Sequence, residues 1–197
     1  MTVLDKSVPF IRVLMVMPRK TVRKEIPLNT KYQYVEFDDT LKEAWCKLQL
    51  EVGLFDSLAQ AKEKWESMLK EDRAFFVQNF LFVADQQGEL MASAGLWPGH
   101  DFEEKRLRVH FVAVKEKAQH QKIAQSMLSK LCMRYDENPG KYPLYLVTQS
   151  QSYGAIALYA RLGFTPYLGN TKDISSEQAE KDWEQVTQIL KEKAVRH

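Results

Sequence analysis

The chain has 197 residues, of which 45% are hydrophobic and 27% are charged, and its formal net charge is +2. This size suits one well-packed domain and is small for two. So mild a charge argues against a nucleic-acid partner, which would need a concentrated basic face with aromatic stacking positions. No apolar run approaches the length of a membrane span, so no membrane partner is expected.

The N-terminal part predicts two strands, at 10–17 and 32–37. The basic, proline-containing stretch 18–27 between them is expected to form a hairpin loop. Asp5 precedes a short apolar run that Arg12 interrupts, and no small-residue cleavage site follows. This segment therefore does not have the pattern of a secretory signal.

Two helices are predicted next, each opened by a capping sequence. Thr40 and Glu43 form a capping box before an apolar stripe that ends near Gly53. Ser57 and Gln60 open the second helix in the same way. Both helices carry apolar residues on one face, so we expect them to pack against a sheet.

Strands are expected at 80–84 and 90–97, turned by residues 86–88. A Pro-Gly break at 98–99 precedes an alternating segment, 108–114, that predicts a third strand. This order predicts a run of antiparallel strands after the two helices.

The next segments predict a strand, helix, strand, helix series. Apolar residues follow one face of a helix from Ile123 to Leu131, a strand begins near Tyr145, and Gly163 ends a second helix. A strand-helix-strand crossover requires parallel strands, so the 108–114 and Tyr145 strands are expected to lie side by side. Residues 175–194 then predict an amphipathic helix, opened by a Ser175-x-x-Gln178 cap, that packs against the domain or a partner.

Basic residues are concentrated in the middle of the chain. Between Lys105 and Arg134 there are eight basic residues and one acidic residue, Glu116, a local net charge of +7. An anionic cofactor would dock here, whereas a solvated charged face is the alternative for any single lysine. Only Lys122 has a positional reason to contact the cofactor.

The two cysteines, Cys46 and Cys132, fall among apolar residues of predicted helices. Buried reduced thiols are therefore expected rather than a disulfide or a metal pair. This usage indicates a reducing, cytoplasmic location, and no metal cofactor is expected.

Three segments, Val112-Ala113-Val114, residues 119–124 and residues 155–164, resemble the GNAT superfamily of acyl-CoA-dependent N-acetyltransferases. The third, an Ala-Ile-x-Leu-Tyr-x-x-Leu-Gly-Phe pattern, carries most of this resemblance. It implies an α/β (α+β) fold: a mixed, mostly antiparallel sheet with one splayed parallel pair, flanked by helices. Residues 1–197 would form one GNAT-like domain, with N-terminal strands in 1–37 and an appended helix in 174–197.

The resemblance also implies acetyl-CoA as co-substrate. Main-chain groups of the 108–114 strand would bind the pantetheine arm as an added strand, and residues 119–124 would form the phosphate-binding loop before a helix. The cofactor-binding residues implied are Val112, Ala113, Val114, Gln119, Gln121, Lys122, Ile123, Ala124, Ser152 and Ala155.

Two of these positions depart from the family pattern. The family phosphate loop reads Gln/Arg-x-x-Gly-x-Gly/Ala, and Lys122 occupies the first glycine position, while Gln119 and Ala124 fit. A glycine lets the main chain approach the pyrophosphate, whereas the lysine side chain must point away from the cofactor. Ser152 stands where the family often carries asparagine.

Tyr159 is the residue that the resemblance assigns as general acid. Its phenol, with a reference pKa of about 10, would protonate the coenzyme A thiolate as it leaves. The alternative is a core tyrosine, because Ala155, Ile156, Tyr159 and Leu162 recur at helical spacing.

The proton acceptor is less clear from the sequence. The family commonly uses a glutamate on the 108–114 strand, and Arg108 stands at the aligned position. His110 is the substitute candidate, since its reference pKa of about 6.5 suits proton transfer; a half-buried structural histidine is the alternative. The weaker candidates are Glu103, Glu104, His100 and Asp101.

The function expected is an N-acetyltransferase that moves an acetyl group from acetyl-CoA to a primary amine by direct attack in a ternary complex. The acceptor is a small molecule or peptide, and a homodimer is compatible with the sequence. Lys122, Ser152 and the missing glutamate leave a non-catalytic acyl-CoA-binding or interaction domain as the alternative. Nucleic-acid binding through the charges of 19–24 and 105–122 is the third reading; those basic residues are not interleaved with stacking aromatics.

Overall fold

The structure, a computed structural model, describes residues 4–137 and 139–194. The chain forms two compact units. Unit 1 comprises Lys24–Trp97 and Val109–Leu131, and unit 2 comprises Pro98–Arg108 with the described residues before Lys24 and after Leu131. The prediction that the chain is a single domain stays a prediction.

Unit 1 contains a sheet of antiparallel hairpins with two helices. Strand β2 (Tyr32–Val35) pairs with β3 (Phe80–Asp85), and β3 pairs with β4 (Leu90–Gly99), both antiparallel. Strand β5 (Arg106–Val114), whose last six residues belong to unit 1, follows β4 in the strand order. Gly95 on β4 faces the Phe80 ring so closely that a Cβ would lie 2.6 Å from it.

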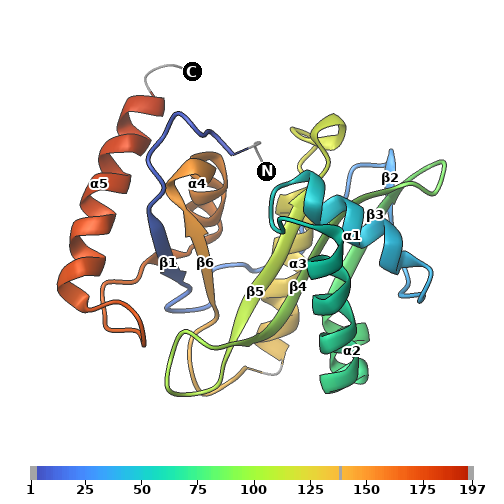
Figure 1. Ribbon diagram of the computed structural model, residues 1–197, viewed down its shortest axis with the longest axis horizontal. Helices are drawn as coiled ribbons and strands as arrows, with labels where there is room; N and C mark the ends of the chain where they lie inside the picture. The colour runs from blue at the N-terminus through green and yellow to red at the C-terminus, as the bar shows by residue number, and fades with distance from the viewer. Residues whose placement is uncertain (1–3, 138, 195–197) are drawn as a thin grey trace. The chain divides into compact units, whose positions relative to one another are not determined.

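Helices α1 (Leu41–Glu51) and α2 (Leu58–Asn79) pack against each other in unit 1 (Figure 1). The Ser57 hydroxyl accepts a hydrogen bond from the Gln60 amide at 3.3 Å, which confirms the second predicted cap. The capping box at Thr40 is wrong, because its side chain makes no cap bond. Instead, Asp38 accepts a bond from the Thr40 amide at 2.8 Å and leads the chain into α1.

The core of unit 1 is a cluster of aromatic rings. Trp65 is 1% exposed and its ring centroid lies 5.2 Å from Trp45 and 5.0 Å from Phe76. Phe76 stacks on Phe80 at 4.0 Å. Such ring pairs add to the free energy gained from burial alone, so α1 and α2 are fixed against the sheet by apolar contacts.

Unit 2 is built around β1 (Arg12–Val16). This strand pairs antiparallel with β6 (Tyr145–Gln149) on one side and with β7 (Thr165–Pro166) on the other. The predicted hairpin between the first two strands is therefore wrong: both edges of β1 are occupied by other strands, while β2 pairs with β3. Residues 18–27 connect the two units instead of closing a tight turn.

Helices α4 (Tyr153–Leu162) and α5 (Ser176–Ala194) complete unit 2. Gly163 ends α4 with a φ of 102°, the left-handed conformation that glycine tolerates. Helix α5 begins after a Ser175 cap, and it packs against β1 and α4 through its apolar face, as predicted (Figure 1). The buried residues of that face are Ala179, Trp183 and Val186.

Strands and helices follow one another along the chain as the sequence predicts, and the fold is a mixed α/β fold. The 3-10 turns η1 (Glu116–Ala118) and η2 (Ser150–Ser152) precede α3 (Ile123–Glu137) and α4. The parallel pairing of β5 with β6 would join the two units, and it stays a prediction together with its splay. Within the described part of the chain, no helix is long and apolar enough to cross a membrane.

Candidate active site

The loop before α3 has the backbone shape of an anion-binding turn. His120 has a φ of 60° and Lys122 a φ of 61°, so two left-handed residues lie just before the helix begins at Ile123. Alternating left-handed residues make main-chain N–H groups converge on a concave site, and a helix N-terminus adds the positive end of its dipole. The loop is therefore shaped to receive a phosphate.

Lys122 keeps the conformation that the expected glycine would adopt. A non-glycine residue at positive φ costs on the order of 1–2 kcal/mol, and the surrounding structure holds this one in place. Its carbonyl accepts a hydrogen bond from the Ser126 hydroxyl at 3.2 Å. The side chain is exposed and has no ion-pair or hydrogen-bond partner among the described residues.

Residues 26–29 support this loop from outside the motif, a contribution that the sequence did not indicate. Asn29 donates a hydrogen bond to the Gln121 side chain at 3.1 Å. The Ser126 hydroxyl also donates to the Pro27 carbonyl at 3.0 Å. Gln119 reaches back to β5, where its amide nitrogen lies 3.4 Å from the Val114 carbonyl oxygen. The Val114 carbonyl is thus contacted by the Gln119 side chain.

The end of β5 is irregular at Phe111, whose φ is 52°. Val112, Ala113 and Val114, which follow it, are buried. His110 is half-buried, and its ring stacks on Phe111 with centroids 5.0 Å apart. Neighbouring side chains of a regular strand point to opposite faces, so this stacking marks a local break in the alternation.

In unit 2, Tyr159 lies on the buried face of α4. The side chain is 5% exposed, and its ring lies edge-on to Phe164 with centroids 6.2 Å apart. Burial raises the pKa of this phenol above its usual value, because the ionised form would lose its hydration. Ser152 and Ala155, at the start of the same helix, are also buried.

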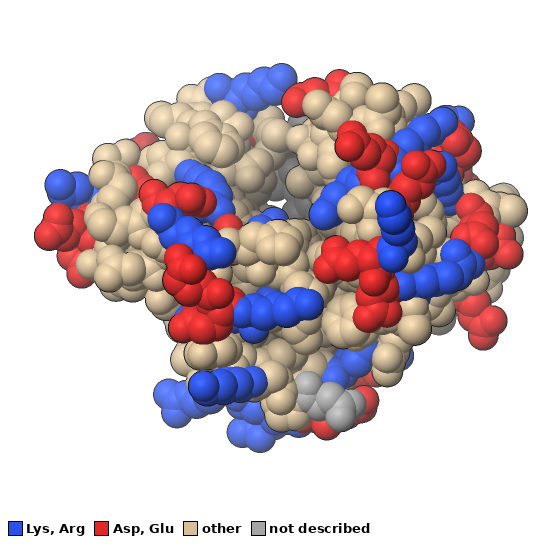
Figure 2. Space-filling model, turned by 60° about the horizontal axis from the view of Figure 1, so that its bottom comes forward, with Lys and Arg blue, Asp and Glu red and all other residues tan. Residues whose placement is uncertain are grey.

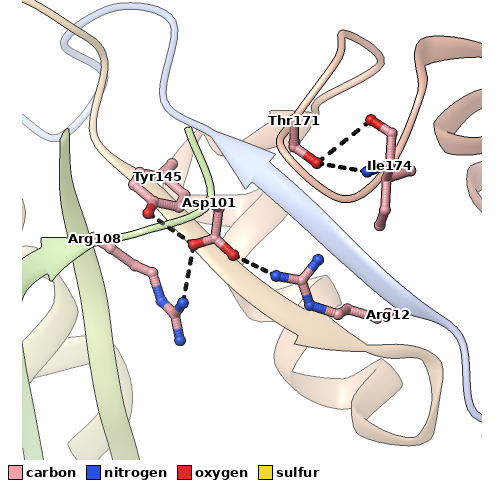
Figure 3. A network of polar contacts seen from close by, with 6 residues as sticks. All are labelled: Arg12, Asp101, Arg108, Tyr145, Thr171 and Ile174. Atoms are coloured by element: carbon pink, nitrogen blue, oxygen red, sulfur yellow. Dashed lines mark hydrogen bonds and ion pairs between the residues drawn. The ribbon is translucent and has the colours of Figure 1, made fainter. Parts of the chain in front are cut away.

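The Asp101 carboxylate is the centre of a polar network that the sequence did not predict (Figure 3). It accepts hydrogen bonds from the Tyr145 hydroxyl at 2.8 Å and from Arg108 at 3.0 Å, and it also pairs with Arg12. Burial raises its pKa, but Tyr145, Arg108 and Arg12 outweigh burial, and the net pKa lies below the usual value. Arg108 is therefore committed to an ion pair and cannot replace the family glutamate as a base.

The Asp101 network also holds the chain segment that follows the Pro-Gly break. A Cβ on Gly99 would lie 1.7 Å from the Tyr145 hydroxyl, so only glycine fits there. Phe102 packs edge-on against Tyr145, with centroids 5.0 Å apart. Phe102 and, in unit 1, Trp97 are 4% and 1% exposed, so both rings belong to cores.

The profile of the Acetyltransferase (GNAT) family matches residues 39–164, well over half of the chain. The chain belongs to the GNAT acetyltransferase family. No curated protein matches the chain. The family assignment confirms the resemblance carried by residues 112–114, 119–124 and 155–164.

Solved structures with the same fold are distant in sequence. A GCN5-related N-acetyltransferase from Sphaerobacter thermophilus is 16% identical, with a TM-score of 0.62 over 80% of this chain and 49% of the other. A GNAT-family acetyltransferase from Colwellia psychrerythraea is 13% identical, with a TM-score of 0.59 over 80% and 53%. An aminoglycoside N-acetyltransferase in complex with CoA is 14% identical, with a TM-score of 0.55 over 71% and 91%. This family member thus spans about half the length of the first two.

The basic residues of the segment 105–134 are less available to an anionic cofactor than the sequence suggests. At least five of the segment's eight basic residues pair with a carboxylate within the described part of the chain: Arg106 with Glu104, Arg108 with Asp101, Lys115 and Lys117 with Glu89, and Lys130 with Glu25. Figure 2 shows acidic and basic side chains interspersed over one face. Lys122, exposed and unpaired among the described residues, is the basic residue of the loop 119–124.

Both cysteines are free and buried, as predicted. Burial raises the pKa of the Cys132 thiol to about 12, and it also raises the pKa of Cys46. Neither thiol is a nucleophile at neutral pH, because the reactive form is the thiolate. Neither cysteine is therefore expected to act as a nucleophile in catalysis.

Proposed function

We propose that this GNAT acetyltransferase moves an acetyl group from acetyl-CoA to a primary amine by direct attack in a ternary complex. The observation that carries the proposal is the loop of residues 119–124. Its left-handed backbone at Lys122 reproduces the shape that glycine normally provides before a helix N-terminus. The departure at this position changes the side chain and leaves the anion-binding backbone in place.

Residues 112–114 of β5 would bind the pantetheine arm and the acyl group. In this proposal the arm pairs with the main chain of Val112 and Val114 as an added strand. A main-chain amide near Val114 then donates to the acyl oxygen. Negative charge develops on that oxygen as the amine attacks, and a fixed donor stabilises it most where water is excluded.

Tyr159 is proposed to protonate the coenzyme A thiolate as it leaves. Its burial keeps the phenol in the protonated form that a general acid needs. The same burial would raise the pKa of a thiol released beside it, because a desolvated thiolate is also penalised. Phe164 fixes the ring from one side.

His110 is proposed to remove a proton from the acceptor amine, directly or through a water. Arg108 cannot do so, because it is protonated and paired with Asp101. The histidine must be neutral to accept a proton, so activity should fall on the acid side of the pH profile. The acceptor itself, a small molecule or a peptide amine, remains part of the proposal, as does the cytoplasmic location that two reduced cysteines suggest.

The first experiment separates an enzyme from a binding module. A ligand that binds only the folded state must raise the thermal midpoint, so we expect acetyl-CoA and free CoA to raise it. Thiol release over a panel of amines then measures turnover. A thermal shift without thiol release on any amine would favour the non-catalytic acyl-CoA-binding domain, and no shift at all would overturn the proposal.

Two substitutions test the residues. Tyr159→Phe should lower kcat about 100-fold while acetyl-CoA still binds, and unchanged turnover would remove the catalytic assignment. His110→Ala should abolish the acidic limb of the kcat/KM profile. If that limb stays in place, the histidine is not the base.

A further inference from the structure

Two buried polar side chains of unit 1 contact the irregular residue of β5. Gln49, in the last turn of α1, and Ser93, in the middle of β4, are both 0% exposed. The Gln49 amide donates to the Ser93 hydroxyl at 2.8 Å, and this hydroxyl donates to the Phe111 carbonyl at 3.3 Å. Two hydrogen bonds thus link Gln49 at the end of α1, Ser93 on β4 and Phe111 on β5.

These hydrogen bonds lie in an otherwise apolar core. The cluster around them consists of tryptophan, phenylalanine and aliphatic side chains. Burying a polar group there is unfavourable unless it is fully hydrogen-bonded, and the side-chain carbonyl oxygen of Gln49, Oε1, has no partner among the described residues. Two aliphatic side chains would fill the same space without the free-energy cost of burying polar groups. Gln49 and Ser93 therefore provide a hydrogen bond that apolar contacts cannot replace.

Gln49 and Ser93 stabilise the left-handed conformation of Phe111. The Phe111 ring is packed by Phe55 from the α1–α2 loop, with centroids 5.8 Å apart, and by Trp45 from α1 at 5.3 Å. Ring packing fixes the side chain, but it does not orient the peptide group. The Ser93 hydroxyl does, because it holds the Phe111 carbonyl oxygen itself.

We propose that Gln49 and Ser93 are positioning residues that fix the Phe111 peptide and thereby aim the backbone amides of Val112 and Val114 at acyl-CoA. This inference rests on the proposed function, because it assigns a purpose to the amides of β5. Gln49 belongs to the last turn of α1, and its main-chain carbonyl accepts a hydrogen bond from the main-chain amide of Leu54 at 2.9 Å. The same residue therefore connects the α1–α2 loop to the strand that holds the acyl group.

The test compares Ser93→Ala with a control in the same unit, Asn79→Ala. Asn79 is also buried, at 7% exposed, and its side-chain amide also donates to a main-chain carbonyl, that of Phe75 at 3.0 Å. We expect Ser93→Ala to raise the KM for acetyl-CoA about fivefold, and to accelerate amide hydrogen exchange of residues 112–114 by a similar factor. Asn79→Ala should leave both unchanged.

Two further variants keep the test decisive. Ser93→Thr retains the hydroxyl and should restore most of the acetyl-CoA KM. Gln49→Met removes the donor with little change in length, and with Ser93→Ala it should show less than the sum of the two single effects, because both act through one carbonyl. If Ser93→Ala does not fold, Gln49→Met carries the same measurement.

The outcomes are separable from those of the proposed function. If the wild-type protein binds and uses acetyl-CoA but Ser93→Ala and Asn79→Ala have equal KM values and equal exchange at residues 112–114, the positioning role is overturned and the activity stands. If the wild-type protein neither binds nor uses acetyl-CoA, both proposals fail.

Discussion

Unit 1 is held together by aromatic rings. Unit 2 is arranged around the buried carboxylate of Asp101 and includes a close contact between Gly163 and Thr21. In unit 1, Trp65 and its neighbours contribute free energy that depends on apolar area and does not change with pH. In unit 2, Asp101 contributes only while it is ionised. The two units of one fold should therefore respond differently to substitution and to acid.

The largest effect is expected in the aromatic core. Trp65→Ala should lower the free energy of unfolding by about 4 kcal/mol, because it leaves a large cavity among rings that cannot all collapse into it. Urea denaturation followed by circular dichroism measures this change. The loss should be the same at pH 7 and pH 4; a loss that depends on pH would break the comparison between the units.

Asp101→Asn should have the next largest effect, about 3 kcal/mol at pH 7, because it leaves two guanidinium groups without their carboxylate. The folded-state pKa of Asp101 is lowered, so its stabilising contribution is complete above the unfolded pKa of about 3.9 and is lost as the pH falls through the folded value. The difference between wild type and variant should therefore shrink below about pH 4. Urea titrations from pH 6 to pH 3 test this. A difference in the free energy of unfolding that stays constant over this range would show that the ionised Asp101 carboxylate does not stabilise unit 2.

Gly163→Ala should destabilise by about 2 to 3 kcal/mol, because two costs add. The left-handed φ of 102° costs about 1 kcal/mol for alanine, and the new Cβ would lie 2.1 Å from the Thr21 hydroxyl oxygen. Gly88→Ala is the matched control, since its φ is 82° and nothing lies within 4 Å of the added carbon. Thermal unfolding of both variants isolates the close contact; equal losses would show that Thr21 moves aside freely.

The smallest effect is expected at Lys122. Lys122→Gly should raise the free energy of unfolding by about 1 kcal/mol or less, because relief of the left-handed strain is partly offset by the greater freedom of glycine in the unfolded chain. Lys122→Ala keeps the strain and removes only the charge. If the lysine contacts the cofactor, Lys122→Ala should weaken acetyl-CoA binding and flatten its dependence on salt, while Lys122→Gly adds stability without restoring affinity. An unchanged affinity for acetyl-CoA in both variants would mean that the Lys122 side chain does not contact the cofactor and that only the main chain of the loop binds it.

Local rules predicted much of this fold from the sequence. The caps at Ser57 and Ser175 and the stop at Gly163 depend on residues within one helical turn, and all three are confirmed. The predicted capping box at Thr40 is wrong: the Thr40 side chain makes no cap bond, and the amide of Thr40, which the Glu43 side chain would cap, donates to Asp38 two residues earlier.

Long-range contacts are the part that the sequence could not predict. The pairing of β1 with β6 and β7 depends on which strand edges meet, and the apparent hairpin in the sequence gave no sign of it. The Asp101 network joins Arg12, Arg108 and Tyr145 from distant segments, and Arg108 at the family's glutamate position was the single hint of it. The left-handed φ of Phe111 and Lys122 could not be predicted from the sequence, because neither residue is a glycine.

The short strand β7 also limits self-association. It lies at the outer edge of the unit 2 strands, beyond β1, and one of its two residues is Pro166, which has no N–H to offer. A strand from another molecule would find too few donors there to extend the ladder. This edge is therefore a poor template for aggregation, even when the protein is concentrated.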